Sequence, residues 1–352
     1  MKIVSIVGAR PQFIKLSTLS KELRKYYHEI IIHTGQHYDH NMSDILLEDL
    51  GIPVPDYNLN IGSGVHGEQT GKMLIGIEEI LLKEKPGLVI VFGDTNSTLA
   101  GSLAASKLHI PLIHIEAGLR SFNRRMPEEI NRLITDHVSN YLFAPTNTAM
   151  INLYKEGLSN NAILTGDIMV DSLNRNLRKA VETSDIDKKL HDIKSFYLLT
   201  LHRPYNVDSV PNLQLIFKNL SLLNKHIVFP IHPRTKNIIL SNKLNIPKNI
   251  IELQPLSYFD FLKVEYLADK IITDSGGIQK EAYILKKPCI TLRTETEWIE
   301  TVEHGWNILV NINDSDFINK IESFKPDKKQ RNVFGTKVTD KMVSHIRKIF
   351  TQ

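Results

Sequence analysis

Short apolar runs alternate with amphipathic stretches along nearly the whole chain, and this alternation limits the fold more than any other feature. It is typical of α/β proteins in which helices cover both faces of a mostly parallel sheet. Apolar residues at helical spacing predict helices at Phe13–Tyr27, Gly71–Lys83 and Ser97–Leu108. The runs that predict strands in the first half are Lys2–Val7, Ile30–His33, Gly87–Phe92, Leu112–Ile115, Tyr141–Ala144 and Ile163–Thr165.

A second series of strands follows and indicates a second domain. The segment Thr183–Lys194 between the two series is charged and lacks a strand pattern. We therefore expect two Rossmann-like domains with parallel sheets, over residues 1–175 and 176–352, and a ligand in the cleft between them. The last predicted helix, Val338–Phe350, could pack on either domain. The predicted strands of the second series are Phe196–Leu201, Ile227–Ile231, Ile250–Leu253, Lys270–Thr273, Cys289–Leu292 and Ile308–Val310.

The composition shows a small basic excess. Forty-three Lys and Arg residues against 39 Asp and Glu residues give a net charge of +4. No lysine- or arginine-dense block is interleaved with aromatic residues, so nucleic acid is not an expected partner. No apolar stretch reaches the roughly 20 residues that span a bilayer, so no membrane partner is expected either. The single cysteine, Cys289, predicts a core position in a reducing compartment, and Arg10 interrupts the N-terminal apolar run too early for a signal peptide, so we expect a cytoplasmic protein.

Acidic residues stand where predicted strands of the first half end. Asp94 follows the run that ends at Phe92, and Glu116 follows Ile115. Because ligands in open α/β sheets bind beyond the carboxyl ends of the strands, we interpret both as candidate proton-transfer groups. Two alternatives stay open. Asp94 can be a helix N-cap, and Glu116 can be the ion-pair partner of Arg120, because a carboxylate at a buried strand end is costly unless it is paired or functional.

The segment after Pro127 predicts a helix that carries a third candidate acid. Glu128 and Arg132 are four residues apart and therefore share a helix face. We interpret Glu128 as a further acid–base group with Arg132 beside it. The alternative is an ordinary helix start with an i,i+4 ion pair, because acidic residues in the first turn stabilise the helix dipole.

The first strand-to-helix turn, residues 8–15, does not contain G-x-G-x-x-G, so a nicotinamide cofactor is not expected. The turn places Arg10, and with it Lys15, near a helix N-terminus, where free N–H groups favour anions. We therefore take Arg10 and Lys15 as candidate phosphate-binding residues. A solvated loop arginine is the alternative for Arg10.

A glycine-rich turn in the second half predicts a phosphate site. A predicted strand runs into Ser275, Gly276 and Gly277 and then into a helix, so that backbone N–H groups can approach a phosphate. Glu281, about one turn into that helix, is placed to accept hydrogen bonds from ribose hydroxyls. A tight turn without a ligand is the alternative.

Histidines follow two predicted strands of the second half. His202 and His232 can each donate to a phosphate or act as an acid, and a capped loop histidine is the alternative for both. A separate group, His33, His37 and His40, has a spacing that fits no standard zinc pattern, so no metal is expected.

These motifs together resemble the non-hydrolysing UDP-N-acetylglucosamine 2-epimerase family over nearly the whole chain. The most specific are Glu-Ala-Gly-Leu-Arg at residues 116–120, Pro-Glu-Glu-x-Asn-Arg at 127–132 and Asp-Ser-Gly-Gly-x-Gln at 274–279. The resemblance implies two Rossmann-like domains in the GT-B arrangement of nucleotide-sugar glycosyltransferases. It also implies a UDP-sugar substrate, a homodimer and no cofactor.

The resemblance assigns a role to each candidate residue by position. Asp94, Glu116 and Glu128 resemble the acid–base carboxylates of the family, and Arg132 resembles an arginine that supports them. His202 resembles the catalytic histidine near the diphosphate. The residues that the resemblance places at the UDP group are Arg10, Ser275, Gly276, Gly277 and, for the ribose, Glu281.

Several segments depart from the commonest form of these motifs. Gly-Ala-Arg-Pro-Gln at residues 8–12 stands for Gly-Thr-Arg-Pro-Glu, and Thr-Glu-Trp-Ile-Glu at 296–300 stands for Thr-Glu-Arg-Pro-Glu. The variants look more like the branch that acts on UDP-2,3-diacetamido-2,3-dideoxy-glucuronate, and the extra basic Lys280 would suit a more anionic ligand. Two altered segments resemble those that contact a second, activating UDP-N-acetylglucosamine in some members, so we do not expect such activation.

The reaction implied is inversion at C2 of a UDP-linked 2-acetamido sugar, gluco to manno, for a polysaccharide or glycan precursor. No carbonyl group is adjacent to C2, so its proton is not acidic enough for simple removal. UDP is therefore expected to leave across C1–C2 and to add back as a proton arrives on the other face. A GT-B glycosyltransferase, a hydrolysing epimerase and a catalytically silent nucleotide-sugar sensor are the alternatives.

Overall fold

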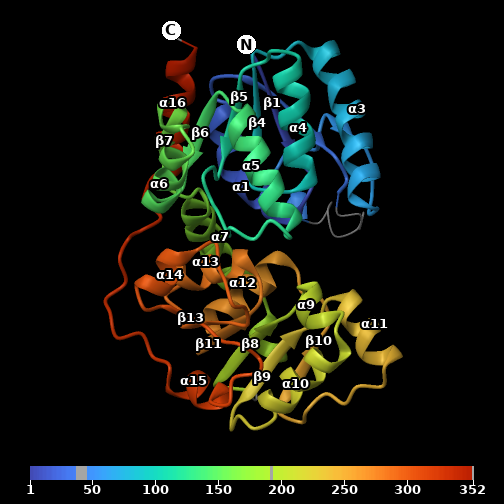
Figure 1. Ribbon diagram of the computed structural model, residues 1–352, viewed down its shortest axis with the longest axis vertical. Helices are drawn as coiled ribbons and strands as arrows, with labels where there is room; N and C mark the ends of the chain where they lie inside the picture. The colour runs from blue at the N-terminus through green and yellow to red at the C-terminus, as the bar shows by residue number, and fades with distance from the viewer. Residues whose placement is uncertain (37–45, 191–192, 351–352) are drawn as a thin grey trace. The chain divides into compact units, whose positions relative to one another are not determined.

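The computed structural model describes residues 1–36, 46–190 and 193–350 and divides into two compact units, shown in Figure 1. Unit 1 contains residues 1–174 together with the C-terminal segment from Asn332, and unit 2 contains residues 175–331. The C-terminal segment thus belongs with the first unit, whereas the sequence left the packing of the last helix open.

The sheet of unit 1 is parallel, and within the described residues it has seven strands in the order β3-β2-β1-β4-β5-β6-β7. The order changes direction between β1 and β4, which makes this pair the topological switch point. In such sheets ligands bind outside the carboxyl ends of the strands at this point. The strands are β1 (Lys2–Val7), β2 (His28–His33), β3 (Tyr57–Asn58), β4 (Leu88–Phe92), β5 (Leu112–Ile115), β6 (Tyr141–Ala144) and β7 (Ala162–Leu164).

Helices cover both faces of this sheet. Alternate residues of β1 and β4, such as Val4 and Val89, form a buried cluster with α3 and α4, and α5 lies beside α4 (Figure 1). On the other face α1 packs with α16, and the Phe13 ring contacts His33 edge-on at 4.9 Å between centroids. The helices are α1 (Arg10–Leu23), α3 (His66–Glu84), α4 (Asn96–Lys107), α5 (Pro127–Val138), α6 (Asn147–Lys155), α7 (Met169–Thr183) and α16 (Val338–Ile349), with a 3-10 turn η1 (Ser159–Asn161).

Unit 2 repeats the same plan. Its parallel sheet has six strands within the described residues, in the order β10-β9-β8-β11-β12-β13, so a second switch point lies between β8 and β11. The strands are β8 (Phe196–Thr200), β9 (His226–Pro230), β10 (Ile250–Leu253), β11 (Lys270–Thr273), β12 (Cys289–Thr291) and β13 (Asn307–Leu309).

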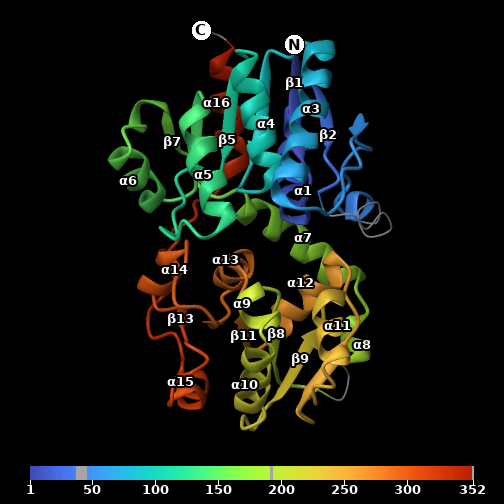
Figure 2. The same cartoon turned by 45° about the vertical axis from the view of Figure 1, so that its right-hand side comes forward.

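Two apolar clusters fill the two sides of this second sheet. One joins the sheet to α10 and α15, and Figure 2 shows α10 beside β8 and β9. The other joins it to α8, α12 and α13. The helices of unit 2 are α8 (Ile186–Lys189), α9 (Pro204–Val207), α10 (Val210–Leu220), α11 (Pro233–Ser241), α12 (Tyr258–Leu267), α13 (Gly276–Ile284), α14 (Ile299–Glu303) and α15 (Phe317–Ser323).

The α/β class with two parallel sheets, predicted from the sequence, is confirmed. The sequence missed β3, because a two-residue edge strand carries no alternating pattern. It also started α3 at Gly71 instead of His66, because the first turn of this helix is polar and shows no apolar stripe.

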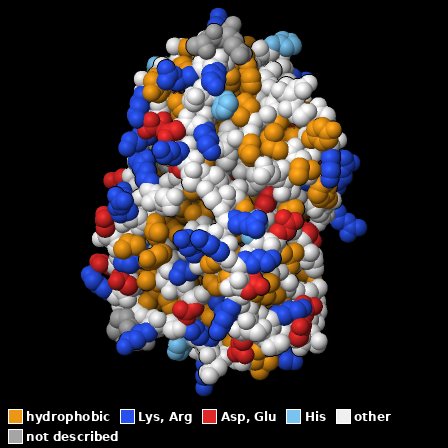
Figure 3. Space-filling view, turned by 90° about the vertical axis from the view of Figure 1, so that its left-hand side faces the viewer, with side chains coloured by type: hydrophobic (Ala, Val, Ile, Leu, Met, Phe, Trp, Pro, Cys, Tyr) orange, Lys and Arg blue, Asp and Glu red, His pale blue; other side chains and the backbone are white. Residues whose placement is uncertain are grey.

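The surface carries charge of both signs. On the face shown in Figure 3, Lys and Arg side chains are interspersed with Asp and Glu side chains, in keeping with the net charge of only +4. Among the helices that the structure describes, none combines the length and the apolar composition that crossing a membrane requires.

Candidate active site

At the switch point of unit 1, Gln12 holds the turns after β1 and β4 together. Its Oε1 accepts hydrogen bonds from the N–H groups of Gly8 (2.7 Å) and Ala9 (3.0 Å). Its Nε2 donates to the carbonyl of Phe92 at 2.8 Å. The buried Gln12, which the sequence showed only as a departure from a motif, thus joins the turn that begins α1 at Arg10 to the end of β4.

Asp94 follows this strand end and is held by α5. Both Nε and Nη2 of Arg132 donate to Oδ2 of Asp94, at 3.0 and 2.6 Å. Nη1 of the buried Arg132 pairs with Glu129 at 2.7 Å. The N-cap of α4 is Thr95, whose side chain accepts from the N–H of Thr98. The capping role that was the alternative for Asp94 therefore belongs to its neighbour.

Glu116 follows β5 and forms an ion pair with Lys15 of α1, both side chains being almost fully buried. Its φ of +78° is unusual for a residue with a side chain, and its N–H donates to the carbonyl of Phe143 at 3.1 Å. Arg120, considered above as its partner, pairs instead with Asp136 and Glu156 at 2.7 Å each. Lys15 lies more than one turn inside α1, and its charge compensates the buried Glu116 carboxylate.

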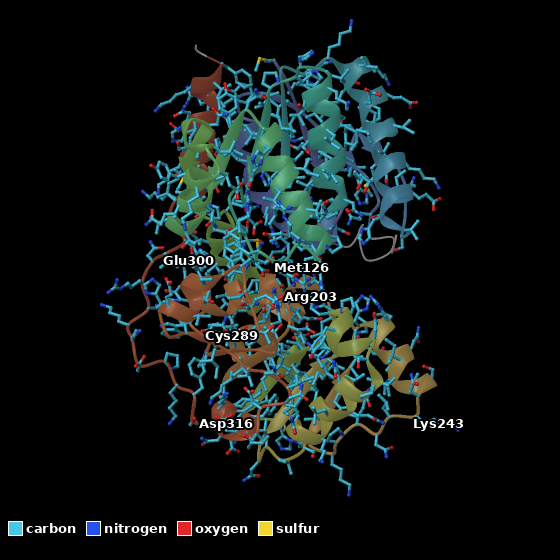
Figure 4. The ribbon with its side chains drawn as sticks, in the orientation of Figure 1. Met126, Arg203, Lys243, Cys289, Glu300 and Asp316 are labelled. Carbon is cyan, nitrogen blue, oxygen red and sulfur yellow. The ribbon has the colours of Figure 1, made fainter. Side chains whose placement is uncertain are left out.

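The glutamates at the start of α5 differ in their surroundings. Met126, labelled in Figure 4, precedes the helix as its N-cap residue. Glu129 is buried and accepts from the N–H groups of Ser121 and Phe122 at 2.9 Å each, so it holds the loop before the helix. Glu128 is partly exposed in the first turn, one turn before Arg132.

The structure thus brings most of the predicted unit 1 residues into one place. A Cβ built on Gly93 would lie 3.3 Å from Lys15 Nζ and 3.6 Å from Glu116 Oε2, so this ion pair lies against the residue that precedes Asp94. Two carboxylates, each beside a cation, therefore meet at the carboxyl ends of β4 and β5. A carboxylate in such a position is suited to accept a proton from a bound ligand.

At the switch point of unit 2, the buried Asp274 organises the loop after β8. Its carboxylate accepts from the N–H groups of His202 and Arg203 at 3.1 Å each and from Nδ2 of Asn206 at 3.0 Å. The His202 ring lies beside it, with Nδ1 3.3 Å from Oδ1, and 48% of that side chain is exposed. Arg203 is labelled at this strand end in Figure 4. Asp274 was part of a predicted motif but received no role from the sequence.

The turn after Asp274 begins α13. Ser275 is its N-cap residue, and its hydroxyl accepts from the N–H of Ile278 at 3.5 Å. Gly276 packs closely against Glu297, because a Cβ there would lie 1.9 Å from Oε1 of this buried residue and would displace its carboxylate. Gly277 is exposed, and a Cβ there would have only the Ser275 hydroxyl within 4 Å.

The remaining predicted residues of unit 2 are not exposed at this turn. Glu281 and Lys280 are buried in α13, and His232 lies at the start of α11. His232 is the N-cap of α11, where its Nδ1 accepts from the N–H of Arg234 at 3.2 Å. Partial burial, together with the Arg234 charge, lowers the pKa of His232 below its usual range. Lys280 is buried, with its Nζ 4.3 Å from the ring centroid of Trp298, so it is not an exposed group for an anionic ligand.

The histidine group and the single cysteine were also considered in the sequence, as a possible metal site and as a core residue. Within residues 1–36, 46–190 and 193–350, no group of three or more His, Cys, Asp or Glu side chains is arranged to hold a metal ion. His33 is buried, and His37 and His40 lie outside the described residues. Cys289 lies in β12 (Figure 4), and burial raises the pKa of its thiol to about 12.

Two Rossmann-like units, one with paired carboxylates and one with a helix N-terminal turn at the switch point, define an α/β enzyme of the GT-B-like type. The model of the UDP-N-acetylglucosamine 2-epimerase family matches residues 21–347, and the chain belongs to this family.

Relatives with known names support this membership. A UDP-N-acetylglucosamine 2-epimerase homolog of Methanococcus maripaludis is 54% identical, with 93% of each chain covered. The UDP-2,3-diacetamido-2,3-dideoxy-D-glucuronate 2-epimerase of Pseudomonas aeruginosa is 49% identical, with 88% of each covered. The solved UDP-GlcNAc 2-epimerase of Methanocaldococcus jannaschii, in complex with UDP-GlcNAc and UDP, is 48% identical with a TM-score of 0.92, over 99% of this chain and 100% of that chain.

Proposed function

We propose that the chain interconverts the gluco and manno epimers at C2 of a UDP-linked 2-acetamido sugar and keeps the UDP in the product. The observation that carries this proposal is the pairing of Asp94 with Arg132 and of Glu116 with Lys15 at one strand edge. Epimerisation requires proton-handling groups on both faces of one carbon, and this edge supplies more than one carboxylate.

The proposed reaction is an elimination followed by a re-addition. One carboxylate takes the C2 proton, the C1–O bond breaks with its electron pair passing to UDP, and a C1–C2 double bond forms. UDP then adds back at C1 while a proton reaches C2 from the opposite face. Glu128 is the third candidate for these transfers, and Arg132 holds Asp94 in place.

Unit 2 is proposed to bind the leaving group. The N–H groups at the start of α13, around Ser275, Gly276 and Gly277, favour an anion. His202 would donate to the diphosphate and Glu281 would accept from the ribose. Arg10 of unit 1 would add positive charge, and the interactions of all these groups would stabilise the charge that develops on the departing UDP.

Two substrates are to be compared. UDP-N-acetylglucosamine is the first choice, since the family model carries its name. The diacetamido-glucuronate nucleotide is the second, because a 49% identical relative is named for it. Proton NMR of an equilibrating mixture distinguishes them by the appearance of the manno epimer. Conversion of neither nucleotide would reject the proposal.

The same assay in heavy water tests the mechanism. Deuterium should enter at C2 while UDP remains attached, whereas a hydrolysing enzyme or a glycosyltransferase would release UDP. The variants Asp94→Asn and Glu116→Gln should each lower kcat by about 10²–10⁴-fold, the usual contribution of a general acid or base. Glu68→Gln, on the exposed surface of α3, is the matched control and should leave kcat unchanged.

We further propose that the enzyme works as a homodimer in the cytoplasm, without a cofactor, in the synthesis of a polysaccharide or glycan precursor. The homodimer and the pathway rest on the family resemblance, and the compartment rests on the single buried cysteine. Light scattering after size exclusion measures the oligomeric state, and a monomer at all concentrations would contradict it.

A further inference from the structure

A fully buried histidine connects the two turns that carry Asp94 and Glu116. Nδ1 of His114 lies 2.6 Å from Oδ1 of Asp136, and Nε2 lies 2.7 Å from the carbonyl oxygen of Gly93. The His114 and Asp136 side chains have no exposed surface. The ring therefore bridges α5 and the end of β4 from a position in β5.

The partners of this ring determine its charge. A carbonyl oxygen can only accept, so Nε2 must carry a hydrogen. Oδ2 of Asp136 already accepts from the N–H of Gly118 at 3.0 Å and lies 2.7 Å from Nη2 of Arg120, which keeps the carboxylate ionised. Nδ1 therefore donates as well, and His114 is an imidazolium.

The charges of this cluster balance. Arg120 and His114 are the two cations, and Asp136 and Glu156 are the two anions, with Nε and Nη2 of Arg120 donating to Glu156 at 2.8 and 2.7 Å. A buried charge is tolerated when it is paired and hydrogen-bonded in this manner. The elements that supply charged groups to the ring are thus α5, the loop at Arg120 and the end of α6.

The hydrogen bonds of this cluster end on backbone groups next to the proposed catalytic side chains. Gly93 directly precedes Asp94, and its N–H also donates to the carbonyl of Ile115 at 2.9 Å. Gly118, held by Asp136, lies two residues after Glu116. One buried ion pair therefore holds the backbone directly before Asp94 and two residues after Glu116.

We propose that His114 is a positioning residue for the C2 proton transfer, held as a buried imidazolium that with Asp136 fixes the turns of Asp94 and Glu116. The expected effect on kcat rests on the proposed function. The charge of the His114 ring does not depend on that function. Misplacing a reacting group by about 1 Å can cost about 10²-fold in rate, so the effect belongs to kcat and not to substrate binding.

The first experiment measures the charge of the ring in the wild-type protein. Histidine is labelled with ¹⁵N, and the His114 ring is identified by cross-peaks to the amide proton of Ile115. Under the conditions of the activity assay, the ¹⁵N spectrum should show a hydrogen on both ring nitrogens, as their two hydrogen-bond partners require. A ring with a hydrogen on only one nitrogen would overturn the charge assignment whether or not the enzyme is active.

The second experiment separates the two hydrogen bonds. In His114→Gln, the side-chain amide nitrogen can take the place of Nε2 and keep the hydrogen bond to Gly93. In His114→Asn, the amide nitrogen can take the place of Nδ1 and keep only the hydrogen bond to Asp136. Per folded molecule, kcat should fall by about 10²-fold in the Asn variant and less in the Gln variant, with KM unchanged. If both variants lose only stability and keep the wild-type kcat, His114 is merely structural and the proposal fails.

The outcomes separate this proposal from the proposed function. A wild-type protein that converts no UDP-sugar contradicts the function and removes the kinetic role of His114, and the NMR result still decides its charge. If neither variant folds, Asp136→Asn, which removes the carboxylate charge and keeps the size of the side chain, provides the comparison. A wild-type kcat per folded molecule in this variant would show that the ion pair does not control the turns.

Discussion

Charge compensation governs the candidate site at the scale of single residues. The sequence identified Asp94 and Glu116 because a carboxylate that ends an apolar strand requires a reason to be there. The resemblance also named Arg132 as a supporting arginine, and the structure pairs it with Asp94. The sequence did not identify the cation beside Glu116, since Lys15 comes from a helix distant in sequence. Lys15 illustrates the limit, because its place near a helix N-terminus predicted a phosphate ligand and the structure pairs it with Glu116.

Removal of the Lys15 charge should destabilise unit 1. Lys15→Met leaves the Glu116 carboxylate buried without its cation, which should lower the free energy of unfolding by about 3–5 kcal/mol. The double variant Lys15→Met/Glu116→Gln should recover part of this loss, because no buried charge then remains. Urea unfolding followed by circular dichroism measures both, and Lys72→Met, in an exposed pair, is the control. Equal destabilisation of the single and double variants would show that the ion pair is not the cause.

At the scale of elements, α5 is the anchor of the unit 1 site. Along this one helix Glu129 holds the preceding loop, Arg132 holds Asp94, and Asp136 holds Gly118 and His114. Sequence spacing predicted that Glu128 and Arg132 share a face, but not that Glu129 holds the preceding loop or that Asp136 reaches His114 of β5. The periodicity of a helix gives the face of each residue and not the neighbour that it meets.

The turn at Gly118 should tolerate no side chain. Its φ is +80°, and a Cβ would lie 2.5 Å from the carbonyl oxygen of Ala149, a backbone atom that cannot rotate away. Gly157 has a similar φ of +76° with nothing within 4 Å, so it isolates the conformational cost. Gly157→Ala should cost about 1–2 kcal/mol of unfolding free energy, and Gly118→Ala more, by about 1–3 kcal/mol for the steric clash. If urea unfolds Gly118→Ala and Gly157→Ala at the same midpoint, the predicted clash with the Ala149 carbonyl is wrong.

Asp136 should make the stability of the protein depend on acid pH. Burial by itself raises the pKa of Asp136, but the His114 ring and the Arg120 guanidinium outweigh it, so the pKa lies below its ordinary value. The stabilisation is therefore fully present above the unfolded-state pKa of about 3.9 and is lost as the pH falls through the folded-state pKa.

The test follows the free energy of unfolding between neutral and acid pH. Asp136→Asn should flatten the decline at acid pH while lowering stability at neutral pH. Asp187→Asn is the comparison, because the pKa of Asp187 is also lowered, by a hydrogen bond from Lys263, yet its side chain is 54% exposed. If the free energy of unfolding of Asp136→Asn fell at acid pH as steeply as that of the wild type, Asp136 would not be the cause of the pH dependence.

At the scale of the whole molecule, two units repeat one strand order, and each places polar groups at its own switch point. The proposed chemistry is accordingly divided, with the candidate proton-transfer carboxylates in unit 1 and the proposed anion-binding turn in unit 2. Each unit has a separate apolar core, so a ligand of one unit should stabilise that unit directly.

Cys289 can report on the stabilisation of unit 2 by a ligand, because it is buried in the core of that unit and the pKa of its thiol is raised to about 12. A thiol reagent should label it only when unit 2 opens. UDP at about 100 times its Kd should stabilise the closed state by about 2.7 kcal/mol and slow labelling by about 100-fold. Inorganic phosphate at the same concentration is the control. A labelling rate that UDP leaves unchanged would place the UDP site outside unit 2.

The sequence by itself determined the fold class, most strand positions and the family, because alternating apolar patterns and strand-end motifs are local properties of the chain. It did not determine which charges pair. Lys15, Asp136, Asp274 and Gln12 act through atoms that are distant in sequence, and only the packing of helices against the sheets brings those atoms within hydrogen-bonding distance. A charged or amide side chain can pair with many groups along the chain, and only its neighbours in the folded protein decide which of them it meets. Tertiary structure therefore decided the geometry of the site.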